Sequence, residues 1–293
     1  MNGWLLVDKP SGISSHDVVQ RARGIIPGCR IGHTGTLDPL ATGLLVLGIG
    51  NTTRLSEYLI SQSKQYTAVV RLGATTTTFD AEGDIMSEKD VRIGAAAIES
   101  ILPNFIGCIE QVPPIYSAIK IGGERAYKLA RSGKTVKMSP RSVRIDKLAI
   151  VDYCSPDITL EISCSSGTYV RSLAHDLGQS IGCGAHLLCL RRDVVGPFSL
   201  HQSCQLEDIE QTNDSCEVSS LLLPSDRAMV GWQKVCLGAD DVRKIRHGNS
   251  VKGSGCVSET LALAYDVEGE LIAILEGQPE FGHWQPRKVL MSK

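Results

Sequence analysis

The chain has 293 residues, of which 42% are hydrophobic and 21% are charged, and its formal net charge is −2. This length can bury a sizeable core, organised by default as one large domain and one small domain. The balanced charge gives little support to a nucleic-acid partner. The aromatic content of 5% argues against a broad base-stacking surface of the single-strand-binding type.

Ten cysteines are spread along the chain, without a C-x-x-C pair and without a Cys/His cluster of zinc-ligand spacing. We therefore predict no metal site and no disulfide framework. The apolar run over residues 4–7 is too short for a signal peptide, and no run reaches the length of a membrane span. These features predict a cytoplasmic protein whose reduced thiols behave as small apolar side chains.

The first elements are predicted as a strand over residues 4–7, a helix over 16–26 and a strand over 44–49. The last of these is an apolar run bounded by glycine, which is typical of a fully buried strand. The polar loop over residues 32–43 precedes it and holds one carboxylate, Asp38. Loops fixed to a rigid scaffold often carry chemistry. A glycine-rich turn with a capping Asp is the alternative.

The rest of the chain is predicted as short strands and helices. Residues 204–220 are polar, and we interpret them as surface run-out of the large domain before a boundary near residue 230. A short strand-rich tail follows. Further strands are predicted over 64–73, 105–111, 144–151, 158–164 and 186–192, and helices over 53–60, 91–102 and 165–181.

A basic segment lies in the middle of the chain, with eight Lys or Arg residues and one Glu between positions 120 and 144. A solvated face is the ordinary explanation of a charge run. Because the excess is concentrated in a chain of net charge −2, we favour a clamp for nucleic-acid phosphates. Its candidate contacts are Lys120, Arg125, Lys128, Arg131 and Arg141.

Residues 32–43 read GHTGTLDPLATG. This string resembles the catalytic loop of the TruB family of tRNA pseudouridine synthases, whose pattern is G-H-x-G-x-L-D-P-x-A-x-G. Every fixed position of the pattern is present. The resemblance implies that Asp38 is the catalytic aspartate. It covers roughly residues 3–200 and is thin beyond them.

Other strings resemble further motifs of the same family. K-P-x-G-x-S-S begins at Lys9, which we expect to supply local packing and charge near the substrate. K-x-Y-x-A contains Tyr66, which in the family lies against the target base; a half-buried strand tyrosine is the alternative. T-x-T-x-D-x-x-G contains Asp80, a candidate contact to RNA or to a basic residue near the site, or a turn-capping Asp.

Residues 167–173 read GTYVRSL and resemble the family's third motif. The resemblance implies that Arg171 pairs with the catalytic aspartate and that Tyr169 lines the pocket. An arginine in the first turn of a helix opposes the helix dipole, and that cost favours a functional role. The H-L-x-x-L-R-R segment over residues 186–192 contains Leu190, which the resemblance places under the target base.

The fold implied by the family is α+β, with a mixed, mostly antiparallel central sheet flanked by helices. It divides the chain into a catalytic domain over residues 1–229, with a thumb-like insertion at about 117–147, and a small β-rich PUA-like RNA-binding domain over 230–293. The implied activity converts the T-loop uridine at position 55 of tRNA to pseudouridine. The implied partner is the tRNA T-arm, with no membrane, no obligatory protein partner, a monomeric state, no cofactor and no metal.

The implied reaction flips the base out of its stack, breaks the C1′–N1 bond, turns the base and forms a C1′–C5 bond. We expect His33 to brace the vacated space, and Tyr66 to stack on the uracil and to accept or relay the C5 proton. Asp38 either attacks C1′ or removes a sugar proton, and the sequence leaves both routes open. Both need an ionised Asp38, whose pKa we expect Arg171 to hold low.

Three other functions compete with this one. A non-catalytic RNA-binding protein on the same scaffold would not need the Asp38, Tyr66 and Arg171 set. An RNA-guided rRNA pseudouridine synthase is disfavoured by the compact length and the small tail. A nucleoside glycosylase would need a water-activating base that the sequence does not offer.

Overall fold

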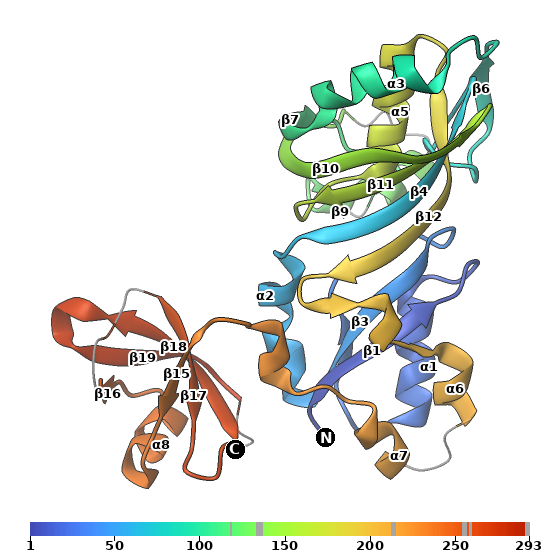
Figure 1. Cartoon of the computed structure of the whole chain (residues 1–293). Helices are drawn as coiled ribbons and strands as arrows, with labels where there is room; N and C mark the ends of the chain where they lie inside the picture. Colours follow the sequence, from blue (N-terminus) through green and yellow to red (C-terminus); the bar gives the residue numbers. More distant parts are fainter. Residues whose placement is uncertain (118, 133–136, 212–214, 254–256, 258–259, 291–293) are drawn as a thin grey trace.

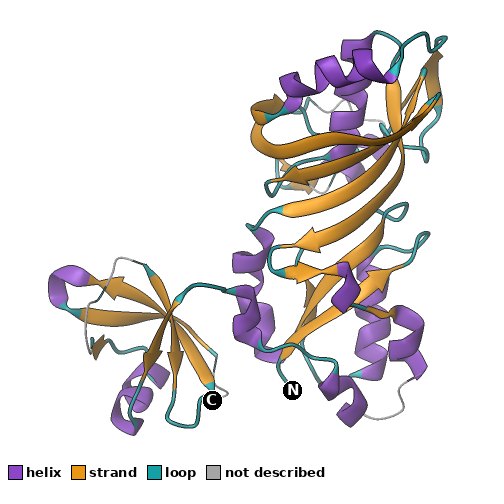
Figure 2. Cartoon of the chain, in the orientation of Figure 1, coloured by secondary structure: helices purple, strands orange, loops and turns teal. Residues whose placement is uncertain are grey.

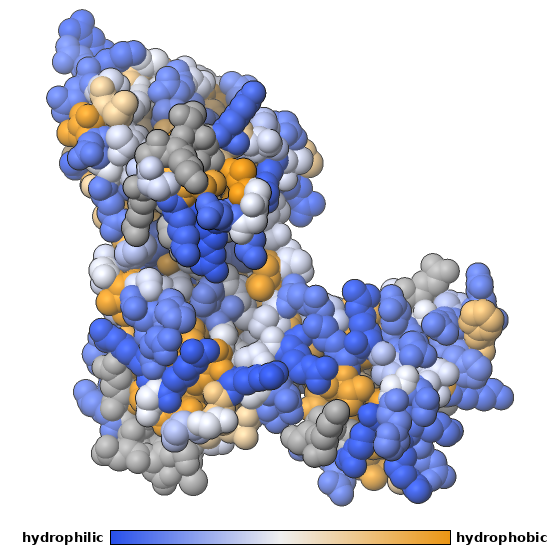
Figure 3. Space-filling view, turned by 180° about the vertical axis from the view of Figure 1, so that it is seen from behind, coloured by the Kyte–Doolittle hydropathy of each residue, from blue (hydrophilic) through white to orange (hydrophobic). Residues whose placement is uncertain are grey.

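The computed structural model describes residues 1–117, 119–132, 137–211, 215–253, 257 and 260–290. The chain forms a tall body, built on one long twisted sheet, and a smaller C-terminal lobe beside the lower part of that body (Figure 1). The body and the lobe enclose an open angle when seen from the front and from behind (Figures 1 and 3).

Within the described residues, ten strands form the body sheet. Neighbouring strands are antiparallel except in two pairs, β1 with β14 and β3 with β12. The predicted mixed, mostly antiparallel sheet of an α+β fold is therefore confirmed. In sheet order the strands are β14 (Cys204–Gln205), β1 (Gly3–Lys9), β3 (Thr42–Ile49), β12 (Ala185–Val195), β4 (Lys64–Leu72), β11 (Asp157–Cys164), β10 (Arg141–Cys154) and β7 (Gly107–Gln111), with β2 (Ile31–His33) on β3 and β13 (Phe198–Ser199) on β12.

Helices lie around the body sheet (Figure 2). Helix α5 packs on β4 and β12, α3 lies beside α5, and α1 packs beside α6. The predicted helix over 16–26 is α1, which begins after Ser14, whose hydroxyl accepts a hydrogen bond from the Asp17 amide. The helices are α1 (Ser15–Ile25), α2 (Ser56–Ile60), α3 (Ala95–Ile101), α4 (Ala126–Arg131), α5 (Val170–Ile181), α6 (Leu206–Gln211), α7 (Ser215–Ser220) and α8 (Ala239–Arg246).

Strand β3 is buried on both faces, as its apolar run predicts. Leu45 and Leu47 enter the main core, whereas Leu44 and Val46 pack with Trp4 in a second apolar cluster. Successive strand residues face opposite sides of a sheet, so a continuous apolar run requires a core on each side. The loop that carries Asp38 therefore leads into a fully buried strand.

Several segments differ from their predictions. The helices over 91–102 and 165–181 are shorter, because α3 begins only after Gly94 and α5 only after Tyr169. The hairpin of β5 (Ala74–Thr76) and β6 (Ile85–Glu88) is not predicted, because β6 is exposed along its length and has no alternating pattern. The prediction that residues 204–220 are a surface run-out of the large domain is wrong in part. This stretch forms α6 and α7, and its apolar residues Leu206, Ile209 and Val218 are buried in the main core.

A second sheet of five strands forms the described part of the C-terminal lobe. Leu263 and Ile274 of this sheet belong to the apolar cluster around Trp4. The Lys288 ammonium also forms an ion pair with Glu57 of the body, with 2.7 Å between Nζ and Oε1. Apolar packing therefore holds the lobe on the body. The surface of the molecule seen from behind is mainly hydrophilic, with separate apolar patches (Figure 3). In sheet order the strands are β15 (Gln233–Cys236), β17 (Leu261–Tyr265), β18 (Leu271–Gln278), β19 (His283–Val289) and β16 (Val251–Lys252).

Candidate active site

A cavity of about 270 Å³ opens where the loop over residues 32–43 meets β4, β12 and the start of α5. The first turn of α1 holds this loop, because the Ser15 hydroxyl accepts from the Leu37 amide at 2.8 Å and donates to the Leu37 carbonyl at 3.0 Å. The cavity lining brings together five of the predicted site residues: Asp38, Tyr66, Tyr169, Arg171 and Leu190.

Asp38 and Arg171 form an ion pair in the cavity wall, with 3.0 Å between Oδ2 of the aspartate and Nη2 of the arginine. The arginine side chain is 7% exposed, whereas the aspartate side chain is 40% exposed. The guanidinium is therefore fixed inside the protein, and the carboxylate is the accessible partner. Arg171 is the second residue of α5, so its charge opposes the helix dipole unless carboxylates surround it.

Asp80 is the second carboxylate beside Arg171, with 3.3 Å between its Oδ2 and Nη1 of the arginine, and its side chain is 3% exposed. The Thr78 hydroxyl and the Glu82 amide both donate to Oδ1 of Asp80. Asp80 thus combines two of its predicted roles, contact with a basic residue and stabilisation of a turn. Arg171 also donates to the carbonyl of Tyr116 at 3.0 Å, which completes its anchoring.

Burial raises the pKa of the Asp38 carboxyl above its ordinary value, and this effect outweighs the lowering by the Arg171 guanidinium. The negative charge of Asp80 adds to the rise. The expectation that Arg171 holds this pKa low is therefore corrected, because the arginine only limits a rise caused by burial. A raised pKa makes the ionised carboxylate a stronger base, which suits both routes left open by the sequence.

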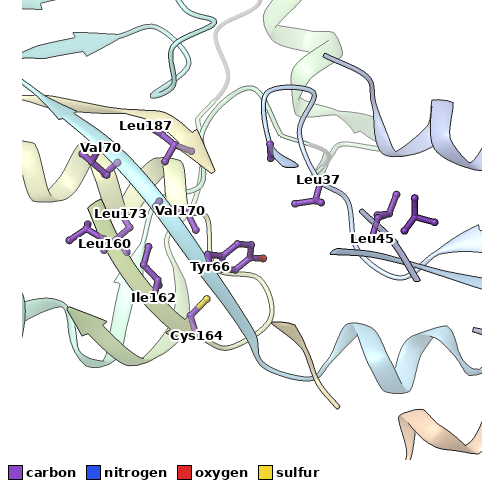
Figure 4. Packing of buried hydrophobic residues seen from close by; sticks show 14 of the residues in the cluster. Leu37, Leu45, Tyr66, Val70, Leu160, Ile162, Cys164, Val170, Leu173 and Leu187 are labelled. Atoms are coloured by element: carbon purple, nitrogen blue, oxygen red, sulfur yellow. The ribbon is translucent and has the colours of Figure 1, made fainter. Parts of the chain in front are cut away.

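Tyr66 enters the cavity from β4, where it lies opposite Ile162 of β11 on one side and Arg192 of β12 on the other. Its ring packs in the main core near Ile162 and Cys164, and its hydroxyl points away from them (Figure 4). Burial raises the pKa of the phenol, which therefore stays protonated at neutral pH. Leu190 adds an apolar side chain to the same cavity.

Tyr169 lines the cavity, whereas His33 does not. Gln111 fixes Tyr169 just before α5, because its amide group donates to the Tyr169 carbonyl at 3.1 Å and accepts from the Tyr169 amide at 2.7 Å. His33 is half-buried at the end of β2 and is not part of the cavity lining. Burial lowers the pKa of His33, so its ring is neutral at pH 7.

Lys9 lies beneath the loop over residues 32–43. Its ammonium is fully buried and donates to the carbonyls of Pro10, Ile13 and Pro39 at 2.8, 2.7 and 3.3 Å. Burial lowers the pKa of Lys9 to about 8. Because Pro39 directly follows Asp38, these bonds give Lys9 a role in holding the loop backbone rather than in touching a substrate.

Ser117, three residues before the basic segment, is part of the cavity lining. The described part of the basic segment forms the hairpin of β8 (Lys120–Ile121) and β9 (Glu124–Arg125), then α4 and the start of β10. The predicted RNA contacts Lys120, Arg125, Lys128 and Arg141 are all exposed, and the side chain of Arg131 lies outside the described residues.

Two buried cations of the cavity wall, Lys64 and Arg192, are not among the residues that the sequence predicts for the site. The Lys64 ammonium donates to two backbone carbonyls, and burial lowers its pKa to about 8. For Arg192, the sequence contains a signal that it is buried. Arg191 and Arg192 are consecutive in a strand, so one of them must face inward. Arg191 is the outward one and pairs with Asp8 at 2.8 Å.

Among the residues that the structure describes, no group of three or more His, Cys, Asp or Glu side chains is arranged to hold a metal ion. The described helices include none with an apolar stretch long enough to cross a membrane.

Solved structures share this fold. A crystal structure of a Cbf5–Nop10–Gar1 complex matches with a TM-score of 0.75 and 24% identity, over 99% of this chain and 85% of that chain. An H/ACA RNP bound to a substrate RNA containing 2′-deoxyuridine matches with a TM-score of 0.73 and 22% identity, over the same shares of the two chains. The body and the lobe together therefore have the fold of the pseudouridine synthase class.

Family models and curated relatives identify the family. The N-terminal domain model of TruB family pseudouridylate synthases matches residues 23–170, and the tRNA pseudouridylate synthase B C-terminal domain model matches residues 171–230. The tRNA pseudouridine synthase B of Pseudomonas aeruginosa (strain UCBPP-PA14) is 42% identical over 100% of this chain and 97% of that protein. The protein of the same name from Stutzerimonas stutzeri (strain A1501) is 40% identical over the same shares. The chain belongs to the TruB family of pseudouridylate synthases, as the loop over residues 32–43 indicates.

Proposed function

We propose that this protein is a tRNA pseudouridine synthase that converts the T-loop uridine at position 55 to pseudouridine, with Asp38 as its catalytic aspartate. The observation that carries this proposal is the buried network in which Asp80 anchors Arg171 and Arg171 orients Asp38 in a cavity that also contains Tyr66. The curated relatives named tRNA pseudouridine synthase B support tRNA as the substrate.

The carboxylates of the site favour isomerisation over hydrolysis. Asp38 is the one acidic residue in the described cavity lining, because Asp80 lies behind it and is occupied by Arg171. Most glycoside hydrolases need two working carboxylates. A single carboxylate suffices when the detached base itself returns to C1′. The electron pair of the C1′–N1 bond leaves with the uracil, which turns and forms the C1′–C5 bond.

Asp38 acts at the sugar, either by attack on C1′ or by removal of a sugar proton. We assign Tyr66 to stacking on the uracil and to the loss of the C5 proton. Because burial keeps its phenol protonated, Tyr66 acts as a relay, whose oxygen accepts the C5 proton while its own proton passes to water. Leu190 packs under the ring, and the apolar walls limit attack by water.

The substrate base must leave its stack to reach the recessed Asp38, so we infer base flipping, with His33 bracing the vacated space and Tyr169 lining the pocket. We further infer that the exposed cations of the basic segment hold T-arm phosphates. We infer a catalytic domain over 1–229, an RNA-gripping insertion at about 117–147 and a PUA-like RNA-binding domain over 230–293. We further propose a cytoplasmic monomer that needs no cofactor and no obligatory protein partner.

A tritium-release experiment with Asp38→Asn tests this function. Each protein is incubated with an unmodified T-arm stem-loop that carries tritium at uracil C5. The matched control is Asp90→Asn, because that carboxylate is 78% exposed and pairs with exposed Arg92 outside the cavity. We expect release by the wild type and the control, none by Asp38→Asn, and a Kd of Asp38→Asn for the RNA within about threefold of the wild type. Release by Asp38→Asn, or lost binding in a folded variant, would refute the assigned role.

A further inference from the structure

Arg192 lies between the two elements that carry the chemistry of the site. Strand β12 runs between β3, which follows the Asp38 loop, and β4, which carries Tyr66. In the strand register, Arg192 lies opposite Gly43 on one side and opposite Tyr66 on the other. One residue of β12 is therefore next to both elements.

The Arg192 guanidinium hydrogen-bonds to the backbone on both sides of Asp38. Its Nε donates to the Leu44 carbonyl at 2.8 Å, and its Nη2 donates to the Gly35 carbonyl at 3.1 Å. The Gly35 carbonyl precedes Asp38 in the chain, and the Leu44 carbonyl follows it. Arg192 also lies opposite Tyr66 in the strand register, and both residues line the cavity. The guanidinium thus closes the base of the loop beside the strand position of Tyr66.

Arg192 is a buried cation without an acidic partner among the described residues. Arg192 is 3% exposed. No described carboxylate oxygen lies within 4.0 Å of its guanidinium, whereas Arg171 pairs with two carboxylates. A buried unpaired charge is costly, so the two backbone carbonyls must offset that cost. Only the planar fork of arginine can reach several such acceptors at fixed angles, and lysine lacks this geometry.

We propose that Arg192 is a positioning residue that fixes the Asp38 loop relative to the Tyr66 phenol. The inference rests on the proposed function, in which Asp38 acts at the sugar and Tyr66 at C5 of one nucleotide. Arg192 touches neither the base nor the sugar in this account. It acts through the backbone of the loop and through its place beside Tyr66, and small displacements of such groups are expensive in rate.

Arg192→Lys tests the proposal, with Arg191→Lys as the matched control. Arg191 is the neighbouring residue, is 44% exposed and pairs with Asp8 outside the cavity. We measure the Kd for the T-arm stem-loop, the single-turnover rate, and the kinetic isotope effect of deuterium at uracil C5. For Arg192→Lys we expect a rate loss of about 10- to 100-fold, a Kd within about threefold of the wild type, and a larger isotope effect, because a displaced phenol slows proton loss. Arg191→Lys should match the wild type in all three.

A merely structural arginine would lower stability without changing the isotope effect. Arg192→Gln is measured alongside, since its amide retains one donor and removes the charge. A wild-type rate and isotope effect in either folded variant would overturn the proposal. Failure of both variants to fold would also overturn it, by assigning Arg192 to stability. A wild-type enzyme that releases no tritium would instead refute the proposed function.

Discussion

Asp38 is subject to opposing influences at the scale of a single carboxyl group. Burial and the charge of Asp80 raise its pKa, and Arg171 lowers it. Both catalytic routes require the ionised form, so the rate falls as the pH falls through this pKa. Because the net shift of this pKa is upward, we expect the rate to begin to fall at a pH above the ordinary pKa range of an aspartate.

Asp80→Asn should move this limb in a defined direction. The substitution removes a negative charge that raises the pKa of Asp38, so that pKa falls and the carboxylate stays ionised to lower pH. The plateau rate should also fall, because Arg171 loses an anchor. Single-turnover rates between about pH 5 and 8 measure both effects. Asp84→Asn, an exposed residue of the same loop, is the control. A limb that moves to higher pH, or stays in place, would contradict the account.

Sequence patterns predict part of the site. The motifs predict that Asp38 and Arg171 pair, and Oδ2 of the aspartate lies 3.0 Å from Nη2 of the arginine. The patterns do not show that Lys64 and Arg192 face the same cavity, because strand register decides which neighbouring side chain points inward. They also do not show the carbonyl partners of Lys9, since Pro39 is brought there only by folding.

The basic segment makes a prediction at the scale of an element. Arg125→Gln/Lys128→Gln removes two exposed charges from the hairpin and α4, and should weaken T-arm binding. It should also reduce the magnitude of the slope of log K against log salt by about 1.5 to 2, because each phosphate contact contributes about 0.7 to 0.9. Lys89→Gln/Arg92→Gln removes two exposed charges elsewhere and should leave the slope unchanged. Equal slopes in the two double variants would contradict the clamp.

Elements with strong periodicity are predictable from the sequence, and those held by scattered contacts are not. The apolar run over 44–49 is typical of a buried strand, and β3 confirms it. The stretch over 204–220 is mostly polar. Its three apolar anchors, Leu206 and Ile209 in α6 and Val218 in α7, are too few to form a stripe over several turns of one helix. Its packing against the core therefore emerges only from the tertiary structure.

The lobe and the body form one packed molecule, which predicts how they unfold. Leu263 is 1% exposed in the apolar cluster that includes Trp4, so Leu263→Ala should lower the free energy of unfolding by about 2 to 4 kcal/mol. Thermal unfolding should stay a single transition at a lower Tm. Val267→Ala, at a residue that is 80% exposed in the same lobe, should change stability by less than about 0.5 kcal/mol. Two separated transitions would contradict a shared core.

The sequence predicts a small strand-rich tail but not where it docks. Leu263 and Trp4 share one apolar cluster, and Lys288 pairs with Glu57, although these residues are remote in the chain and belong to no motif. The arrangement of the whole molecule therefore depends on tertiary packing that composition and periodicity do not encode.

Mapping pseudouridine on a full-length, unmodified tRNA transcript tests whether the protein acts at position 55 through Asp38. The transcript contains uridines in every arm, so the experiment reads both the reaction and the choice of substrate base. We expect pseudouridine at position 55 alone with the wild-type protein, and none with Asp38→Asn. Pseudouridine at other positions, or at none with a folded protein that binds the tRNA, would contradict the proposed function.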